Sequence, residues 1–203
     1  MNIYHRFLKL PFTINKPEQF NEAGKDFIMY VGKDVIPPEM PAWLDSLGLT
    51  LSNVIEGFYS APNGGEVPIH SDTVTKPGEY DSVKINMTWG PANSVTKWWQ
   101  VNEENNLIEI VHDQTEINKG FEQAGITPDI ECYKCYSADP KNLTLVHEQV
   151  INAPSILNVG QLHSTFNPHP NEHRWTLSFT PLKDGKTIQF KDAIKIFETC
   201  LEK

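Results

Sequence analysis

Two histidines and one aspartate in this chain have the residue types and spacing of a metal site. His70 and Asp72 are separated by one residue, so on an extended segment their side chains point the same way. His163 lies far downstream, and only the tertiary fold can bring it to the other two. Two imidazoles and one carboxylate can hold a divalent ion such as iron(II) on one face and leave the opposite face open. Without further context, His70 and Asp72 could equally be polar loop residues, with Asp72 closing a turn.

An arginine shortly after His163 could bind an anion beside such a metal. Arg174 follows His163 by 11 residues, about the length of one strand, a turn and the start of the next strand. On a strand, Arg174 shares one face with Thr176 and Ser178, and apolar residues alternate with them on the other face. If the polar face points inward, the guanidinium could form a two-point contact with a carboxylate. The alternative is an exposed polar face over an apolar one, which is a common pattern in sheets.

These residues stand in two segments, EGFYSAPNGGEVPIHSD (56–72) and LNVGQLHSTFNPHPNEHRWTLSFTPL (157–182). Together the segments resemble the 2-oxoglutarate- and iron(II)-dependent dioxygenase superfamily, in particular its prolyl and aspartyl/asparaginyl hydroxylase-like members. The resemblance covers about residues 52–100 and 150–182. It implies an enzyme that uses molecular oxygen to hydroxylate a peptide side chain or a small molecule. It also implies that Fe(II) and 2-oxoglutarate are the cofactors, with the catalytic metal held by His70, Asp72 and His163.

The same resemblance suggests which residues bind 2-oxoglutarate. Arg174 matches the family's arginine, and Thr176 matches the position two residues later, with Ser178 as the alternative. Asn86 lies on the polar face of a strand expected at residues 82–89, where hydrogen bonding within the sheet explains it equally well. Tyr59 is a further candidate for the cosubstrate site.

Other histidines, aromatic residues and cysteines allow competing interpretations. His169 is the second choice for the distal metal ligand, although it lies in a turn. The tryptophans at positions 89, 98 and 99 could line a substrate entrance, but strand aromatics more often pack in a core. Cys132 and Cys135 form a CxxC pair with no second pair to complete a zinc site, so two free thiols are expected.

The pattern of short strands separated by Gly, Pro and Asn predicts a mainly β fold with flanking helices, and the resemblance implies a double-stranded β-helix (jelly-roll, cupin-like). We expect a single domain over residues 1–203. Its core would comprise about residues 51–100 and 150–182, with an insertion at about 101–149 and the N-terminal segment packed outside. Within these regions we expect strands at residues 51–60, 82–89, 95–101, 107–111, 155–158 and 174–181. Short helices are expected at residues 42–47 and 193–202.

Composition narrows the partners that we expect. The chain has 203 residues and a formal net charge of −9, which disfavours nucleic acid as a partner. It has no apolar run long enough to cross a membrane, and its start lacks the features of a signal peptide, so we expect no membrane association. Three cysteines do not suggest a disulfide framework, and a cytoplasmic location is the simplest expectation.

Two other classes of protein remain open at this point. The chain could be another metal-dependent cupin-type enzyme that does not use 2-oxoglutarate, which would require Arg174 to be exposed or otherwise paired. It could also be a non-catalytic β-sandwich binding module in which the motif residues match by accident. A metal-binding assay separates the last possibility from the first two, and succinate production separates those two from each other.

Overall fold

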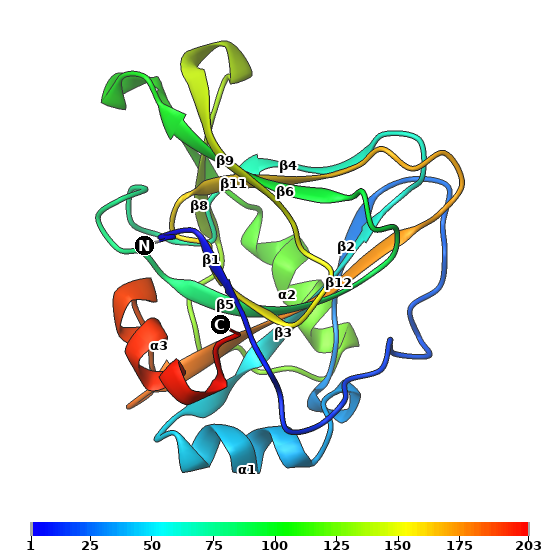
Figure 1. Ribbon diagram of the computed structural model, residues 1–203. Coiled ribbons are helices and arrows are strands. Elements are labelled where there is room, and N and C mark those ends of the chain that lie inside the picture. The colour runs from blue at the N-terminus through cyan, green and yellow to red at the C-terminus, as the bar shows by residue number, and fades with distance from the viewer. Residues whose placement is uncertain (1, 203) are drawn as a thin grey trace.

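A computed structural model describes residues 2–202 of the chain. Across these residues most strands belong to two facing antiparallel sheets (Figure 1). The larger sheet contains, in spatial order, β1 (His5–Phe7), β10 (Ser155–Asn158), β5 (Val83–Trp89), β12 (Arg174–Lys183), β3 (Thr50–Ser60) and β2 (Phe27–Tyr30), with β13 (Lys186–Thr187) paired to β12. The smaller sheet contains β4 (Gly65–His70), β11 (Leu162–Asn167), β6 (Val95–Val101) and β9 (Leu143–Val150).

The strand order is that of a double-stranded β-helix, as the sequence predicted. From β3 to β6 successive strands alternate between the two sheets, and from β9 to β12 they alternate again. Each return of the chain therefore lies beside an earlier strand, as in the pairs β12–β3, β10–β5 and β11–β4. This winding brings the end of β4 next to β11, although the two are far apart in sequence.

The main apolar core lies on the outer face of the larger sheet. Val83, Ile85 and Met87 of β5 are buried there, as the alternation in the sequence predicted. Two helices cover this face, α1 (Glu39–Ser46) with Met40 and Leu44, and α3 (Phe190–Ile196) with Phe190 and Ala193. The opposite face of the same strands looks into the space between the sheets and carries polar residues.

The segment between β6 and β9 forms a separate ribbon and helix. β7 (Leu107–Val111) pairs with β8 (Lys134–Ala138), and α2 (Gln114–Gln123) lies between them in the chain. A bridge between Ser71 and Tyr136 joins β8 to the end of β4. Short 3₁₀ helices lie at Lys33–Val35, Glu104–Asn106, Pro140–Asn142 and Glu198–Cys200.

The structure differs from the sequence expectation at one boundary and in the place of the N-terminal segment. β9 is a member of the smaller sheet, so the segment outside the β-helix ends earlier than residue 149. The N-terminal segment does not simply pack outside the sheets, because β1 and β2 form the two edges of the larger one. Strands of three and four residues are too short to show a periodicity that sequence inspection can recognise.

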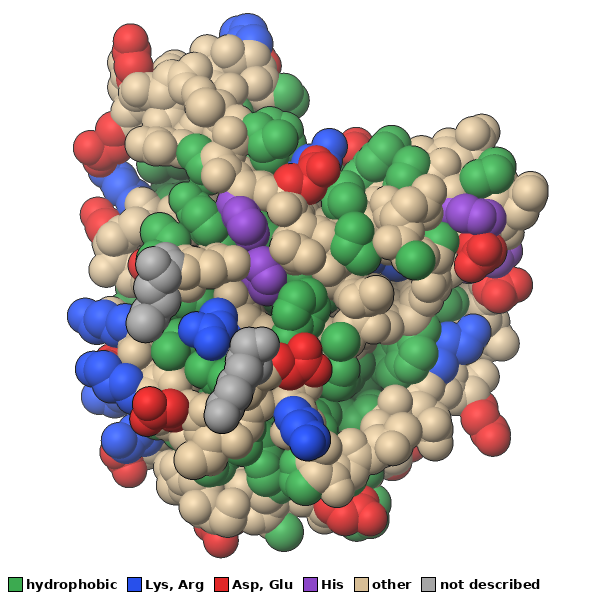
Figure 2. Space-filling model, in the orientation of Figure 1, with side chains coloured by type: hydrophobic (Ala, Val, Ile, Leu, Met, Phe, Trp, Pro, Cys, Tyr) green, Lys and Arg blue, Asp and Glu red, His purple; other side chains and the backbone are tan. Residues whose placement is uncertain are grey.

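Within residues 2–202, none of the helices has the length and apolar character needed to cross a bilayer. On the face of the molecule shown in Figure 2, acidic and basic side chains are interspersed along the margins, and apolar side chains reach the surface between them.

Candidate metal centre

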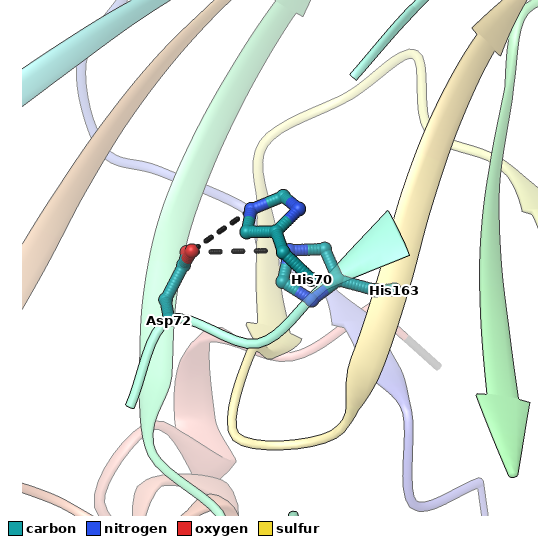
Figure 3. A group of neighbouring side chains, drawn as sticks. All are labelled: His70, Asp72 and His163. Atoms are coloured by element: carbon teal, nitrogen blue, oxygen red, sulfur yellow. Dashed lines mark ion pairs between the residues drawn. The ribbon is translucent and has the colours of Figure 1, made fainter. Parts of the chain in front are cut away.

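His70, Asp72 and His163 converge at one end of the smaller sheet (Figure 3). One potential ligand atom from each residue lies within 4.8 Å of those of the other two. His70 is the last residue of β4 and His163 is the second residue of β11, and the antiparallel register of these strands places them directly opposite each other. The three residues that the sequence selected for a metal site therefore lie together.

Backbone hydrogen bonds fix the turn that carries Asp72. The Ser71 N–H donates to the carbonyl of Tyr136 at 2.8 Å, and the Asp72 N–H donates to the carbonyl of Val159 at 2.8 Å. The first contact ties the turn to the β7–β8 ribbon, and the second ties it to the segment just before His163. Both bonds hold the carboxylate on the same side as the two imidazoles.

The two imidazoles are oriented by backbone carbonyls. His70 Nδ1 lies 2.7 Å from the carbonyl oxygen of Pro68, and His163 Nδ1 lies 3.0 Å from that of Gln161. A carbonyl only accepts, so each Nδ1 carries a proton, and Nε2 is the nitrogen of each ring that faces the other two residues. His70 Nε2 lies 3.0 Å from Asp72 Oδ1, and His163 Nε2 lies 4.0 Å from Asp72 Oδ2. Without a metal ion the His70 Nε2 donates to Asp72 Oδ1, and it must lose that proton before both Nε2 atoms and the carboxylate can bind a common ion.

The electrostatics of this cluster depend on burial and on close charges. Burial opposes the charged form of His70, but the Asp72 carboxylate outweighs this effect and raises the His70 pKa above its usual value. Burial also opposes ionisation of Asp72, but Lys84 and His70 hold its pKa well below the usual range. Burial and the neighbouring His70 lower the pKa of His163 to about 4. A neutral His163 and an ionised Asp72 are the forms that bind metal ions.

Two further charged residues, which sequence reasoning did not select, stand behind Asp72. The ammonium of Lys84 on β5 lies 2.9 Å from Asp72 Oδ2 and also pairs with Glu56 of β3. The Lys84 side chain is only 9% exposed. The sequence did contain a signal for Lys84. It lies on the same face of its strand as Asn86, and the apolar residues that alternate with these two lie on the other face.

Arg174, the first residue of β12, is a buried cation that faces the same centre. It is 2% exposed, and its Nε and Nη1 atoms have no hydrogen-bond partner among residues 2–202. Burial lowers its pKa to about 10, so the guanidinium still carries its charge at neutral pH. Arg174 lines a small cavity together with His70, Asp72 and His163, as the sequence predicted.

Three of the other residues predicted to bind the cosubstrate also line this small cavity. They are Asn86, Thr176 and Ser178. The Ser178 hydroxyl donates to Asn86 Oδ1 at 2.7 Å, and Thr176 Oγ1 lies 3.3 Å from the hydroxyl of Thr88. Sequence reasoning missed Thr96 and Thr165, which line the same cavity from β6 and β11.

Tyr59, which the sequence suggested as part of the cosubstrate site, lines neither of the two cavities beside the cluster. Its ring is buried in the core on the outer face of the larger sheet, and its hydroxyl contacts the carbonyl of Ala23 and the Nδ1 atom of His173 at 2.5 Å. Strand periodicity explains the error, because Tyr59 alternates with Glu56 and Phe58, which point inward.

Two cavities adjoin the cluster. The small one in front of Arg174 has a volume of about 20 Å³, room for about one water-sized group. A larger cavity of about 510 Å³ opens on the other side of the cluster. The residues that line both are Phe58, Val67, His70, Asp72 and Val159.

The remaining histidines have other surroundings. His169 lies 3.1 Å from Glu172 in a surface turn, which removes it as the alternative metal ligand. His173 contacts Tyr59, His112 lies 3.4 Å from Cys135 Sγ, and His147 lies 3.2 Å from His5.

The tryptophans and cysteines also have assignable places. Trp98 is fully buried in a core cluster, Trp99 donates to Ser164, and Trp89 packs against the main core, so none of the three lines either cavity. Cys132 and Cys135 are free thiols, as expected, and both line the larger cavity.

No protein-family model and no curated protein matches this chain. Among solved structures, an oxalate oxidase in complex with the substrate analogue glycolate is 13% identical, with 89% of this chain and 77% of that chain covered and a TM-score of 0.34. EvdO2 from Micromonospora carbonacea var. aurantiaca is 13% identical, with 82% of this chain and 72% of that chain covered and a TM-score of 0.39. The same protein complexed with 2-oxoglutarate is 12% identical, at the same coverage and TM-score. Likenesses this distant identify no function, and the double-stranded β-helix of this chain follows from its own strand order.

Proposed function

We propose that this protein is an iron(II)- and 2-oxoglutarate-dependent oxygenase that hydroxylates a C–H bond of its substrate. The observation that carries the proposal is Arg174, a buried cation that faces the His70, Asp72 and His163 cluster across a small cavity and whose Nε and Nη1 find no acceptor in the described part of the chain. An unpaired buried charge is costly, so a site that retains one is built for an anion. A set of three metal-ligand residues and an anion-binding arginine line one cavity, which suits a ligand that contacts both the metal ion and the arginine.

The cluster fits iron(II) by the nature of its donors. Two neutral imidazoles and one carboxylate on one side of an ion leave further coordination positions open, which is the arrangement of non-haem iron(II) oxygenases. The carbonyls of Pro68 and Gln161 hold the imidazoles in the required tautomer. Lys84 contacts Asp72 Oδ2, which leaves Oδ1 as the more available donor for the ion.

The charge and the polar lining of the small cavity suit the distal carboxylate of 2-oxoglutarate. Nε and Nη1 of Arg174 have no hydrogen-bond partner among residues 2–202, and either of them can form a two-point contact with a carboxylate together with Nη2. Thr176 and Ser178 place hydroxyls along the same inward face of β12. The other end of the cosubstrate would then lie toward the metal ligands.

With both groups bound, iron(II) and 2-oxoglutarate supply the oxidising chemistry, in which oxygen is consumed, the cosubstrate is converted to succinate and carbon dioxide, and a C–H bond is hydroxylated. The residues of this chain bind and orient these groups and keep bulk water away from them. His163 and Arg174 are both at most 6% exposed, so the cosubstrate end of the site is shielded from solvent. A buried site of this kind strengthens the charge contacts that hold the cosubstrate.

The metal part of the proposal is tested by titrating the protein with Mn(II), a paramagnetic stand-in for iron(II), and measuring free ion by electron paramagnetic resonance. We expect one ion per chain. Asp72→Ala should weaken binding at least about 100-fold, because it removes the charged ligand. His169→Ala removes a surface histidine and should leave the affinity unchanged. If wild type binds no ion, or if the two variants behave alike, the site is not a metal centre.

The reaction class is tested by incubating the iron-loaded protein with 2-oxoglutarate in air and measuring succinate. Succinate formation that requires Asp72 supports the oxygenase. A protein that binds metal but forms no succinate and does not bind 2-oxoglutarate would instead be a cupin-type enzyme of another kind.

A further inference from the structure

The larger cavity beside the metal centre has the size of a small-molecule site. Its volume of about 510 Å³ lies within the range of roughly 300–1,000 Å³ that is typical of such sites. The walls are largely apolar, with Val54 and Phe58 from β3, Ile69 from β4 and Ile110 from β7 among the contributors. α2 adds Ile117, so the ribbon and helix between β6 and β9 close one side of the cavity.

One end of this cavity is ionic, and its charges cancel. Lys84 and Arg174 are cations, and Glu56 and Asp72 are anions. Glu56, Asp72 and Lys84 line the large cavity, and Arg174 lies across the shared wall in the small one. The four side chains therefore sum to zero charge. Two further charged residues line the large cavity outside this group: Glu131, which is exposed to solvent, and Lys134, which pairs with Glu109. A divalent metal ion and a dicarboxylate have opposite charges of equal size, so the net charge of the site stays zero when both are bound.

This balance determines which ligands the cavity can take. A charged group buried in the large cavity would have no free counter-charge there, because Lys84 already pairs with both Glu56 and Asp72 and Arg174 faces the small cavity. Its desolvation would not be offset. An uncharged group with a hydrogen to donate does have a partner. Lys84 contacts Oε2 of Glu56, which leaves Oε1 to accept a hydrogen bond from a ligand. The Glu56 side chain is 14% exposed and lines the cavity, so this oxygen is within reach of a ligand there.

We propose that the larger cavity binds a small, uncharged, mostly apolar molecule that carries one hydroxyl or N–H group for Glu56. That this molecule is the substrate of the hydroxylation rests on the proposed function. Its binding does not, because the apolar walls and the charge balance belong to the chain itself.

The experiment uses a fluorescent probe and three competitors with one apolar body. N-phenyl-1-naphthylamine is apolar and uncharged with a single N–H, and its fluorescence should rise in the cavity. It is then displaced at neutral pH with octan-1-ol, octanoate or octylammonium, which differ in the charge of the head group. We expect octan-1-ol to compete at least about 10-fold better than either ion, which corresponds to 1.4 kcal/mol. Equal or better competition by octanoate or octylammonium would overturn the proposal, as would absence of probe binding.

Two variants locate the site and test the charge argument. Glu56→Gln leaves one cation without a counter-charge. The affinity of octanoate relative to that of octan-1-ol should therefore rise by about 10-fold or more. Glu66→Gln, an exposed position on β4, is the matched control and should change nothing. Ile110→Trp fills the cavity and should weaken the probe and all competitors. If Glu56→Gln leaves the order of the competitors unchanged, or if Ile110→Trp leaves probe binding intact, the proposal fails.

The displacement series is run on the metal-free protein and again with Mn(II) and 2-oxoglutarate present. Octanoate can also reach Arg174 when 2-oxoglutarate is absent, so octan-1-ol is compared with octanoate in the presence of Mn(II) and 2-oxoglutarate, and with octylammonium in both states. Failure of the proposed function would appear as absence of 2-oxoglutarate binding in calorimetry, with the displacement series unaffected. Failure of the ligand proposal would appear in the displacement series alone.

Discussion

At the scale of single residues, the buried charge of Arg174 lowers the stability of the ligand-free protein and, by our proposal, binds the cosubstrate. The guanidinium has been withdrawn from water, and two of its nitrogens receive no acceptor in return from the described chain. Residues that face a ligand often carry such a cost, because the ligand completes their contacts. The same argument separates Arg174 from Lys84, whose charge is matched within the chain by Asp72 and Glu56.

Arg174→Met should therefore stabilise the ligand-free protein. Methionine keeps much of the apolar stem and removes the unpaired charge, and we expect a gain of about 1–4 kcal/mol in the free energy of unfolding. Urea denaturation of wild type and variant without metal or cosubstrate measures this. A loss of stability of similar size would mean that Arg174 is satisfied in the folded chain and is a structural residue.

Spacing, residue chemistry and the family resemblance together selected three side chains that lie close to one another and a buried arginine that lines the same cavity. That they bind a metal ion and an anion stays a prediction. His70 and Asp72 share a short segment, and His163 and Arg174 occur in order with about a strand and a turn between them. Sequence reasoning misplaced Tyr59, because the face of β3 that points inward depends on a register that only the paired strands reveal. It did not select Glu56 and Lys84, because their pairing spans two strands separated by β12.

At the scale of elements, the connection from β10 to β11 determines where His163 lies. This segment packs closely on the start of β5, where the N–H groups of Val159 and Gly160 both donate to the carbonyl of Ser82 at 3.0 and 3.2 Å. A Cβ atom on Gly160 would lie 2.4 Å from the carbonyl oxygen of Tyr80 and 2.6 Å from the backbone nitrogen of Ser82. Only glycine allows the two backbones to approach this closely.

Gly160→Ala should push the connection away from β5 and carry His163 with it. We expect a loss on the order of 3 kcal/mol in the free energy of unfolding and weaker Mn(II) binding. Gly24→Ala is the control, because a Cβ atom there meets nothing within 4 Å. Unfolding midpoints and metal titrations of both variants give the answer. A variant at position 160 that matches the control in both would show that this close packing does not position the metal ligand.

Elements with a clear period were predicted well, and those without one were not. The strands expected at residues 95–101 and 155–158 have the same bounds as β6 and β10. β7 also has the expected bounds, and it pairs with β8. The expected C-terminal helix at 193–202 begins earlier, at Phe190, and gives way to a 3₁₀ turn at Glu198–Cys200. β8, β9 and α2 were not anticipated, because β8 is only five residues long, β9 has no regular alternation of apolar and polar residues, and α2 is mostly polar.

At the scale of the whole molecule, buried histidines couple the fold to pH. His5 is 5% exposed on the edge strand β1, where it stacks on Trp98 and contacts His147. Burial, followed by the charges of His147 and Arg6, lowers the pKa of His5 to about 4. In the unfolded chain it returns to its ordinary value near 6.5.

Between pH 6.5 and 4 the unfolded chain therefore binds a proton at His5 that the folded chain does not bind. The stability from this group is fully present above pH 6.5 and is lost as the pH falls toward 4. We expect the free energy of unfolding to fall between pH 7 and 4.5, and His5→Phe to reduce that fall by on the order of 2 kcal/mol. Urea denaturation at both pH values tests this, and an unchanged fall in the variant would contradict the assignment to His5.

The measurement that tests the central claim most directly is calorimetric titration with 2-oxoglutarate of oxygen-free, Mn(II)-loaded protein. Wild type is compared with Arg174→Lys, and with Arg6→Lys as the matched control on β1. Lysine keeps the charge but cannot make the two-point contact, so we expect Arg174→Lys to lose about 2–5 kcal/mol of binding energy, roughly 30-fold or more, with Mn(II) affinity unchanged. Arg6→Lys should bind like wild type. Equal affinities in all three proteins, or no binding in any, would contradict the proposal that Arg174 anchors a 2-oxoglutarate cosubstrate beside the metal.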